Sequence, residues 1–351
     1  MSRLQTMSWP TSRAWLPREP DAILRRSDGT PVRTLRLVSY ALEDFGGRFL
    51  TTDRVAAGDN TYPGISAYVE WFVPQHARPI SITLVHGGGG QSSEFLRTPD
   101  NRPGWVHAFL DAGFPVYLLD RPGHGRSQWI PEVLGPATGF PPYELLYPRF
   151  VEPARAQLWD EADKHSAWPD DEGAGERFMA SQGVMATTLE AAQAHVEAIS
   201  DALFALTGPT LLLSHSAGGP CGWALTAMGG ELVEGVVAVE PLGFPGMEHA
   251  NGCFSNGLVA KEFLGESDPY DRPIVVITGE ATWMRSANAK LVEYLEDRGS
   301  PVEHFRLEDF GLFGNGHMMM SEKNSEEIAA LIINWICNTI PGVKPDDVGA
   351  A

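Results

Sequence analysis

Residues 211–219 read LLLSHSAGG and place two hydroxyls and an imidazole between three leucines and a pair of glycines. A serine hydroxyl becomes a nucleophile only when a base takes its proton, so catalysis also needs a histidine, an orienting acid and donors for an oxyanion. Ser216 lies where an apolar run meets a helix-like segment, with the small residues Ser214 and Gly218 two positions to either side. A nucleophile on such a sharp turn requires small flanks, because the backbones nearly touch. The pattern predicts Ser216 as a nucleophile; an ordinary strand-to-helix turn is the alternative for these five residues alone.

Short apolar runs recur along the chain, and a helix-like segment follows each of them. This alternation predicts an α/β fold with a mostly parallel sheet that helices cover on both faces. The six predicted strands of this kind are residues 80–88, 114–123, 209–216, 234–241, 272–280 and 301–309. Residues 34–42 and 65–74 alternate in hydrophobicity, which predicts two antiparallel strands at one edge of the sheet. Apolar spacings of three and four predict helices over residues 188–206 and 325–336.

Residues 128–187 are rich in proline, glycine and aromatic residues and are too many for a plain connection. We interpret them as an inserted cap or lid within a core of residues 31–127 and 188–345, which an N-terminal extension of residues 1–30 precedes. We expect most aromatic side chains of this segment to form its own small core and one or two to line an apolar pocket above Ser216. They are Trp129, Phe140, Tyr143, Tyr147, Phe150, Trp159 and Trp168.

Two further motifs precede the Ser216 turn, and each follows a predicted strand. They are HGGGG at residues 86–90 and DRPGHGRS at residues 120–127. In their order and spacing, the three motifs make residues 34–340 resemble the α/β-hydrolase superfamily. The resemblance implies the α/β-hydrolase fold and assigns residues 86–90 to the loop that forms the oxyanion hole.

The glycines of this loop also have a physical role of their own. Without a Cβ atom, backbone N–H groups can approach a ligand and point at it. We expect an oxyanion to accept hydrogen bonds from Ala217, the residue after the nucleophile, and from Gly88 or Gly89. We expect His86 to fix the loop by hydrogen bonding rather than to act as a base.

The resemblance also implies a catalytic histidine between the last strand and the last helix. The loop FGNGHMMM at residues 313–320 holds the only histidine there, so His317 is the expected base. The other histidines fit less well, since His304 lies in a predicted strand, His195 in a predicted helix and His124 in a loop that is usually architectural.

The orienting acid is not where most relatives carry it. They have an aspartate a few residues after the strand that ends near Ile277, but residues 279–283 read GEATW. Glu240 follows the apolar residues 236–239, and a carboxylate at the end of such a strand is costly unless a group donates to it. The N–H of His317 would be that donor. This arrangement is similar to a smaller group of bacterial carboxylesterases whose triad acid is a glutamate after the sixth strand.

Ser216, His317 and Glu240 predict a serine esterase that cleaves a small apolar or aromatic carboxylic ester through an acyl-enzyme. Glu280 is the second choice for the acid and Asp309 the third, and a salt-bridged strand-end carboxylate is the structural alternative for Glu240. Lactonase, thioesterase and acyltransferase reactions use the same acyl-enzyme and stay open. A non-catalytic binding protein on the same fold is an alternative of another class. No cofactor is implied, since no spacing of histidines and carboxylates resembles a metal site.

The composition is that of an acidic globular chain of 351 residues, with 45 acidic and 26 basic side chains and a formal net charge of -19. A field of this sign repels DNA and RNA, so we expect no nucleic-acid partner. Residues 1–21 contain no apolar core typical of a secretory signal, and no stretch is long enough to span a membrane. We therefore expect a cytosolic protein, and a homodimer is compatible with the sequence.

Overall fold

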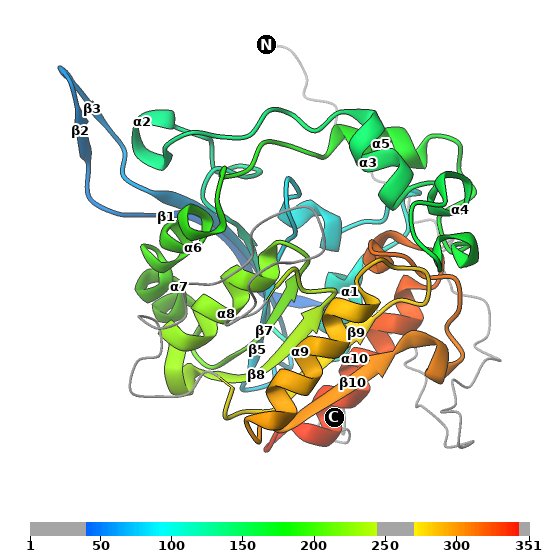
Figure 1. Ribbon diagram of the computed structural model, residues 1–351. Coiled ribbons are helices and arrows are strands. Elements are labelled where there is room, and N and C mark those ends of the chain that lie inside the picture. The colour runs from blue at the N-terminus through cyan, green and yellow to red at the C-terminus, as the bar shows by residue number, and fades with distance from the viewer. Residues whose placement is uncertain (1–39, 244–269, 344–351) are drawn as a thin grey trace, which may run out of the picture.

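The computed structural model describes residues 40–243 and 270–343, which form an eight-stranded sheet with helices packed on both faces (Figure 1). In spatial order the strands are β1 (Leu42–Thr51), β4 (Ser66–Pro74), β6 (Val116–Asp120), β5 (Ser81–Val85), β7 (Thr210–His215), β8 (Val233–Val239), β9 (Ile274–Thr278) and β10 (Val302–Arg306). The last six are parallel to one another, whereas β1 and β4 are antiparallel to their neighbours at one edge. The predicted α/β fold with a mostly parallel sheet is confirmed.

The central strands are apolar along their whole length rather than in alternation. Every residue of β5, β7 and β9 is buried. Strands of a parallel sheet lose both faces to helices, so a continuous apolar run is the expected sequence. All six predicted parallel strands are present.

The helices form two layers, one on each face of the sheet. Two helices pack on one face, α1 (Trp105–Asp111) and α10 (Ser325–Thr339). Four helices pack on the other, α6 (Leu189–Glu197), α7 (Ser200–Thr207), α8 (Gly218–Gly229) and α9 (Arg285–Asp297). Successive strand residues point to opposite faces, so Leu84 joins the first core and Val85 the second. Within the two described ranges, no helix has both the length and the hydropathy needed to cross a membrane.

Two sequence predictions are displaced. The first edge strand is β1 at residues 42–51 rather than residues 34–42, of which 34–39 lie outside the described residues. β1 lies at the sheet edge and is mostly exposed, so burial leaves little hydrophobic pattern in its sequence. The predicted helix over residues 188–206 is divided into α6 and α7. At the division, the Ser200 hydroxyl donates to the Glu197 carbonyl at 2.8 Å, a local bond that competes with a continuous helix.

Residues 128–187 lie across the carboxyl ends of the parallel strands (Figure 1). They carry four short helices, α2 (Pro131–Leu134), α3 (Tyr143–Phe150), α4 (Pro153–Ala156) and α5 (Ala174–Ala180). The Gly183 N–H donates to the Gly89 carbonyl at 2.7 Å, and the Ser166 N–H donates to the Gly314 carbonyl at 3.1 Å. These contacts join the segment to two loops of the predicted site. Its assignment as a cap stays a prediction, and the extension of residues 1–30 lies outside the described residues.

The remaining elements are small. A two-stranded ribbon pairs β2 (Val55–Ala57) with β3 (Asn60–Tyr62). The single-turn 3₁₀ helices are η1 (Ser92–Phe95), η2 (Ala162–Lys164), η3 (Gly230–Leu232), η4 (Leu307–Phe310) and η5 (Met319–Ser321).

Candidate active site

Ser216 occupies a sharp turn between β7 and α8. Its backbone φ is 52°, a left-handed value that residues with a Cβ atom rarely adopt. Its N–H donates to the Val239 carbonyl at 3.1 Å, which holds the turn against the end of β8. A Cβ on Gly218 would lie 2.3 Å from the His86 carbonyl oxygen, so the position two residues after Ser216 requires glycine. Such a strained turn presents a serine hydroxyl above the carboxyl edge of a parallel sheet.

Three side chains from separate parts of the chain form one continuous set of hydrogen bonds at this edge. Ser216 Oγ–H donates to His317 Nε2 at 2.7 Å, and His317 Nδ1–H donates to Glu240 Oε2 at 3.1 Å. His317 is 2% exposed and Glu240 is fully buried. Glu240 directly follows β8, and His317 lies in the loop between β10 and α10. The structure therefore brings together the residues that the sequence predicts as nucleophile, base and acid.

Donors from the loop after β9 fix the Glu240 carboxyl group. Oε1 accepts the Gly279 N–H at 2.7 Å, and Oε2 accepts the Thr282 hydroxyl at 2.6 Å. With His317, three donors converge on the two oxygens of Glu240. A carboxylate held in this way orients an imidazole and selects the tautomer with its proton on Nδ1.

The two other candidates for the acid are engaged elsewhere. Glu280 Oε2 accepts the Gly314 N–H at 2.9 Å, and Oε1 lies 3.6 Å from Lys164 Nζ. Asp309 lies in η4 and lines a surface cavity. In the described ranges, neither carboxylate forms a hydrogen bond or an ion pair with His317. Glu240 is therefore the carboxylate that the structure places against the histidine.

Burial shifts the pKa values of both His317 and Glu240. It lowers the pKa of His317 well below its ordinary value, and the nearby His215 lowers it further. It raises the pKa of Glu240 to about 8, an effect that the hydrogen bonds from Thr282 and Gly279 oppose. The imidazole is therefore neutral and able to accept a proton at Nε2. The form with an ionised Glu240 and a neutral His317 gains population as the pH rises.

The glycine loop after β5 passes beside the Ser216 turn in a space that excludes side chains. A Cβ on Gly88 would lie 2.8 Å from Met185 Sδ, and a Cβ on Gly89 would lie 2.3 Å from the Gly183 carbonyl oxygen. Within residues 40–243 and 270–343, no acceptor takes the N–H of Gly88, Gly89 or Ala217. Three backbone donors near Ser216 could therefore bind an oxyanion.

His86 fixes the start of this loop. Its Nδ1–H donates to the Gly87 carbonyl at 2.9 Å, and its Nε2 accepts the Arg121 backbone N–H at 3.2 Å. Burial lowers the pKa of His86 well below its ordinary value, which keeps the ring neutral and suits one donor and one acceptor nitrogen. The position of His86 matches the structural role expected from the sequence.

Aromatic rings enclose the His317 imidazole. Trp283 stacks on it with the ring centroids 4.5 Å apart and an interplanar angle of 28°, and the Phe150 centroid lies 5.5 Å from it. Trp159 in turn contacts Trp283 with the centroids 5.2 Å apart. Phe150 and Trp159 thus lie beside the site. Trp168 contacts Phe178, and both pack with the main core on the α1 and α10 face of the sheet rather than in a separate core of residues 128–187.

Sequence reasoning missed two residues that contact His317. The His215 Nε2–H donates to the His317 carbonyl at 2.9 Å, and the two rings lie 4.8 Å apart. In the sequence, His215 is only the residue between Ser214 and Ser216, and nothing there indicates this contact. Trp283 lies in GEATW at residues 279–283, where the aspartate of most relatives is absent. A large aromatic residue beside a predicted acid site was the one available signal for it.

Comparisons with known proteins establish the family of the chain. A family model for the alpha/beta hydrolase fold matches residues 81–302. The chain belongs to the α/β-hydrolase family. Its sequence is 31% identical to that of "Probable secreted lipase phiG" of Fungal sp. (strain ATCC 74256), in an alignment that covers 78% of this chain and 86% of the lipase. A solved structure of a novel bacterial esterase is also similar to this chain, with a TM-score of 0.63 and 22% sequence identity. The alignment covers 88% of this chain and 99% of the esterase chain.

These findings confirm the predicted α/β-hydrolase fold and the predicted likeness to carboxylesterases. The predicted cytosolic location is wrong, because the matched lipase is named as secreted. That prediction depended on residues 1–21, which lack an apolar core typical of a secretory signal, and a mature secreted chain from which the signal has been removed would give the same pattern.

Proposed function

We propose that the protein is a serine carboxylic ester hydrolase that works through an acyl-enzyme on Ser216. The observation that carries this proposal is the set of hydrogen bonds from Ser216 through His317 to Glu240, next to backbone donors that have no protein acceptor in the described ranges. The relative named as a lipase supports the same class of reaction. The triad, the oxyanion hole and the acyl-enzyme are the parts that experiment must test.

In the first half of the reaction, Ser216 Oγ attacks the ester carbonyl carbon while His317 Nε2 takes the hydroxyl proton. Glu240 stabilises the imidazolium that forms and keeps its Nδ1–H directed at Oε2. The carbonyl oxygen becomes an oxyanion and accepts hydrogen bonds from Ala217 and from Gly88 or Gly89. When the carbon–oxygen bond to the alcohol breaks, His317 gives its proton to the leaving alkoxide and the acyl group stays on Ser216.

In the second half, a water molecule attacks the acyl carbonyl. His317 Nε2 removes a proton from this water, and the same backbone donors bind the second oxyanion. Collapse of that intermediate releases the carboxylic acid and returns the proton to Ser216 Oγ. The same imidazole therefore serves both steps, as a base when neutral and as an acid when protonated.

The surroundings of the triad favour an apolar substrate. Trp283, Phe150 and Met185 lie around the imidazole and the glycine loop, and none of them carries a charge. We therefore assign esters with an apolar or aromatic group next to the carbonyl as the substrate class. The secreted relative supports an extracellular place of action.

Ser216→Ala and His317→Ala test the proposal directly. On p-nitrophenyl acetate and butyrate, we expect each variant to lose at least about 10⁴-fold in kcat, because a triad acts as a unit. Ser214→Ala is the matched control, since it removes a hydroxyl two residues away, and it should retain kcat within about threefold. Full activity in Ser216→Ala would refute the proposed function. A parallel series of a lactone and a thioester compares the alternative acyl-enzyme reactions.

A further inference from the structure

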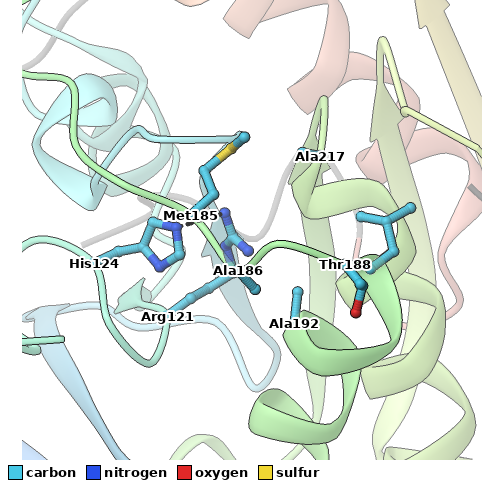
Figure 2. Close-up of a pocket in the computed structure, with 8 residues that line it drawn as sticks. Arg121, His124, Met185, Ala186, Thr188, Ala192 and Ala217 are labelled. Atoms are coloured by element: carbon cyan, nitrogen blue, oxygen red, sulfur yellow. Dashed lines mark hydrogen bonds between the residues drawn. The ribbon is translucent and has the colours of Figure 1, made fainter. Parts of the chain in front are cut away.

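Arg121 is a buried arginine beside the glycine loop, with 3% of its surface exposed. Its Nη2 donates to the carbonyl oxygens of Gly87 at 2.6 Å and Gly88 at 2.9 Å. Nη1 lies 3.6 Å from Cys221 Sγ, and Nε has no acceptor within the described residues. Figure 2 shows the guanidinium next to the His124 ring at the wall of a small cavity.

The same cavity reaches the nucleophile turn. Arg121, His124, Met185 and Ala217 line it, and its volume of about 20 Å³ admits one water-sized group. Ala217 carries one of the proposed oxyanion donors. Arg121 and Ala217 therefore border a single small space (Figure 2).

In the part of the chain that the structure describes, no carboxylate forms an ion pair with Arg121, and Glu94 reaches the same loop only by accepting the Gly87 N–H at 3.3 Å. The preceding residue, Asp120, pairs instead with Arg126 at 2.7 Å. Burial and the Arg121 charge lower the pKa of both His86 and His124 well below the ordinary value, so neither imidazole adds a charge. A buried cation without a counter-charge is costly in free energy. Its presence next to the proposed site calls for a negative group that forms during the reaction.

The hydrogen bonds of Arg121 also determine where the loop's donors point. None of the described peptide bonds is cis, and in a trans peptide the C=O and N–H groups point in opposite directions. Because Arg121 holds the carbonyls of Gly87 and Gly88, the N–H groups of Gly88 and Gly89 face away from the guanidinium. The loop itself adjoins the nucleophile, since a Cβ on Gly87 would lie 3.1 Å from Ser216 Cβ.

We propose that Arg121 is the positioning residue of the oxyanion hole, and that the oxyanion is the counter-charge which its guanidinium lacks in the resting enzyme. The inference rests on the proposed function, because it needs a tetrahedral intermediate on Ser216. Negative charge forms on the substrate oxygen as Ser216 Oγ bonds to the carbonyl carbon, and it disappears when the alkoxide departs. Arg121 acts through the polarised peptide groups and stabilises the transition state more than the bound ester, so its effect falls on kcat rather than on KM.

Two substitutions separate the charge from the hydrogen bonds. Arg121→Met removes both at similar volume, whereas Arg121→Lys keeps a charge without the planar fork. On p-nitrophenyl butyrate, we expect kcat to fall about 10²- to 10³-fold in Arg121→Met and by a smaller factor in Arg121→Lys, with KM within about threefold of the wild type. A trifluoromethyl ketone adds to Ser216 Oγ and places an alkoxide in the oxyanion hole, so its inhibition constant should rise by the factor that kcat/KM loses.

Arg78→Met is the matched control. Arg78 is also buried, and its Nε–H donates to the Ala112 carbonyl at 2.7 Å, but it precedes β5 at the opposite end of the strands from Ser216. Its kcat should stay within about threefold of the wild type. Thermal unfolding of each variant separates lost folding from lost catalysis. If Arg121→Met does not fold, the kcat and the ketone inhibition constant of Arg121→Lys test the inference.

The outcomes distinguish this inference from the proposed function. If Ser216→Ala retains activity, the proposed function itself fails. If Ser216→Ala is inactive but the folded Arg121 variants keep kcat and the ketone affinity of the wild type, the proposed function stands and the role of Arg121 is refuted. A loss confined to KM for esters that bear a carboxylate also overturns the inference, because it would make Arg121 a substrate-binding residue.

Discussion

Replacing Glu240 by glutamine removes one charge from the proposed triad at almost unchanged size. In the wild type, Oε2 accepts the His317 Nδ1–H at 3.1 Å and Oε1 accepts the Gly279 N–H at 2.7 Å. An amide nitrogen in the Oε2 position would face the imidazole as a donor, so His317 would carry its proton on Nε2 and could not accept one from Ser216. An amide nitrogen in the Oε1 position would instead face the Gly279 N–H.

The first orientation loses the favoured imidazole tautomer, the second sets two donors against each other in a buried site, and neither supplies a negative charge to stabilise the imidazolium. We expect kcat to fall about 10⁴-fold, which is about 5 kcal/mol of transition-state stabilisation, with KM nearly unchanged. The assay is steady-state release of p-nitrophenol from a short-chain ester, and thermal unfolding verifies that the variant is folded.

Glu280→Gln is the internal control for this experiment. The Glu280 carboxylate accepts the Gly314 N–H at 2.9 Å and does not contact His317, and a glutamine oxygen can take over that hydrogen bond. We expect its kcat to stay within about threefold of the wild type. An inactive Glu280→Gln beside an active Glu240→Gln would refute the assignment of the acid.

Three further predictions follow from the charges and hydrogen bonds around the site. The competent pair is an ionised Glu240 with a neutral His317, and burial raises the Glu240 pKa to about 8. We therefore expect kcat/KM to rise about tenfold per pH unit on the acid side and to level off only above about pH 8, and a pH-independent profile would contradict this. Burial, and to a smaller extent repulsion from Glu326, raises the pKa of Asp111 from 3.8 to about 7, so the wild-type protein loses stability as the pH rises through this range. In urea unfolding, Asp111→Asn should therefore be more stable than the wild type by about 1 kcal/mol at pH 8, allowing for partial exposure, with no gain at pH 4. The Glu322 carboxylate accepts hydrogen bonds from His165 at 3.0 Å and from the N–H of Gly316, next to His317, at 2.8 Å. His165→Ala should therefore lower the free energy of urea unfolding by about 1–3 kcal/mol and also lower kcat, and unchanged values of both would contradict a role of Glu322 in holding the His317 loop.

Local motifs made the nucleophile and the base accessible to sequence analysis. Ser216 requires small neighbours and a strand before it, and His317 lies in a loop between two readily predicted elements. Glu240 was inferred from free energy, because a carboxylate at the end of an apolar strand needs a donor. The structure places the His317 imidazole against it.

The contacts that sequence analysis could not predict join residues far apart in the chain. Trp283 stacks on His317, and Arg121 holds the carbonyls of the loop at residues 86–90. No periodicity relates such pairs, since each depends on how separate loops meet at the carboxyl edge of the sheet. The edge strand β1 was displaced for a related reason, because an exposed strand retains little hydrophobic pattern.

The most direct test of the account is to identify the residue that carries the acyl group. The protein is mixed with a p-nitrophenyl ester, quenched in acid within milliseconds, digested and analysed by mass spectrometry. We expect the acyl mass on Ser216 in the wild type, more of it when deacylation is slow, and none in Ser216→Ala. An acyl group on another residue, or turnover by the folded enzyme with no covalent intermediate on Ser216 at any quench time, would contradict the proposed mechanism.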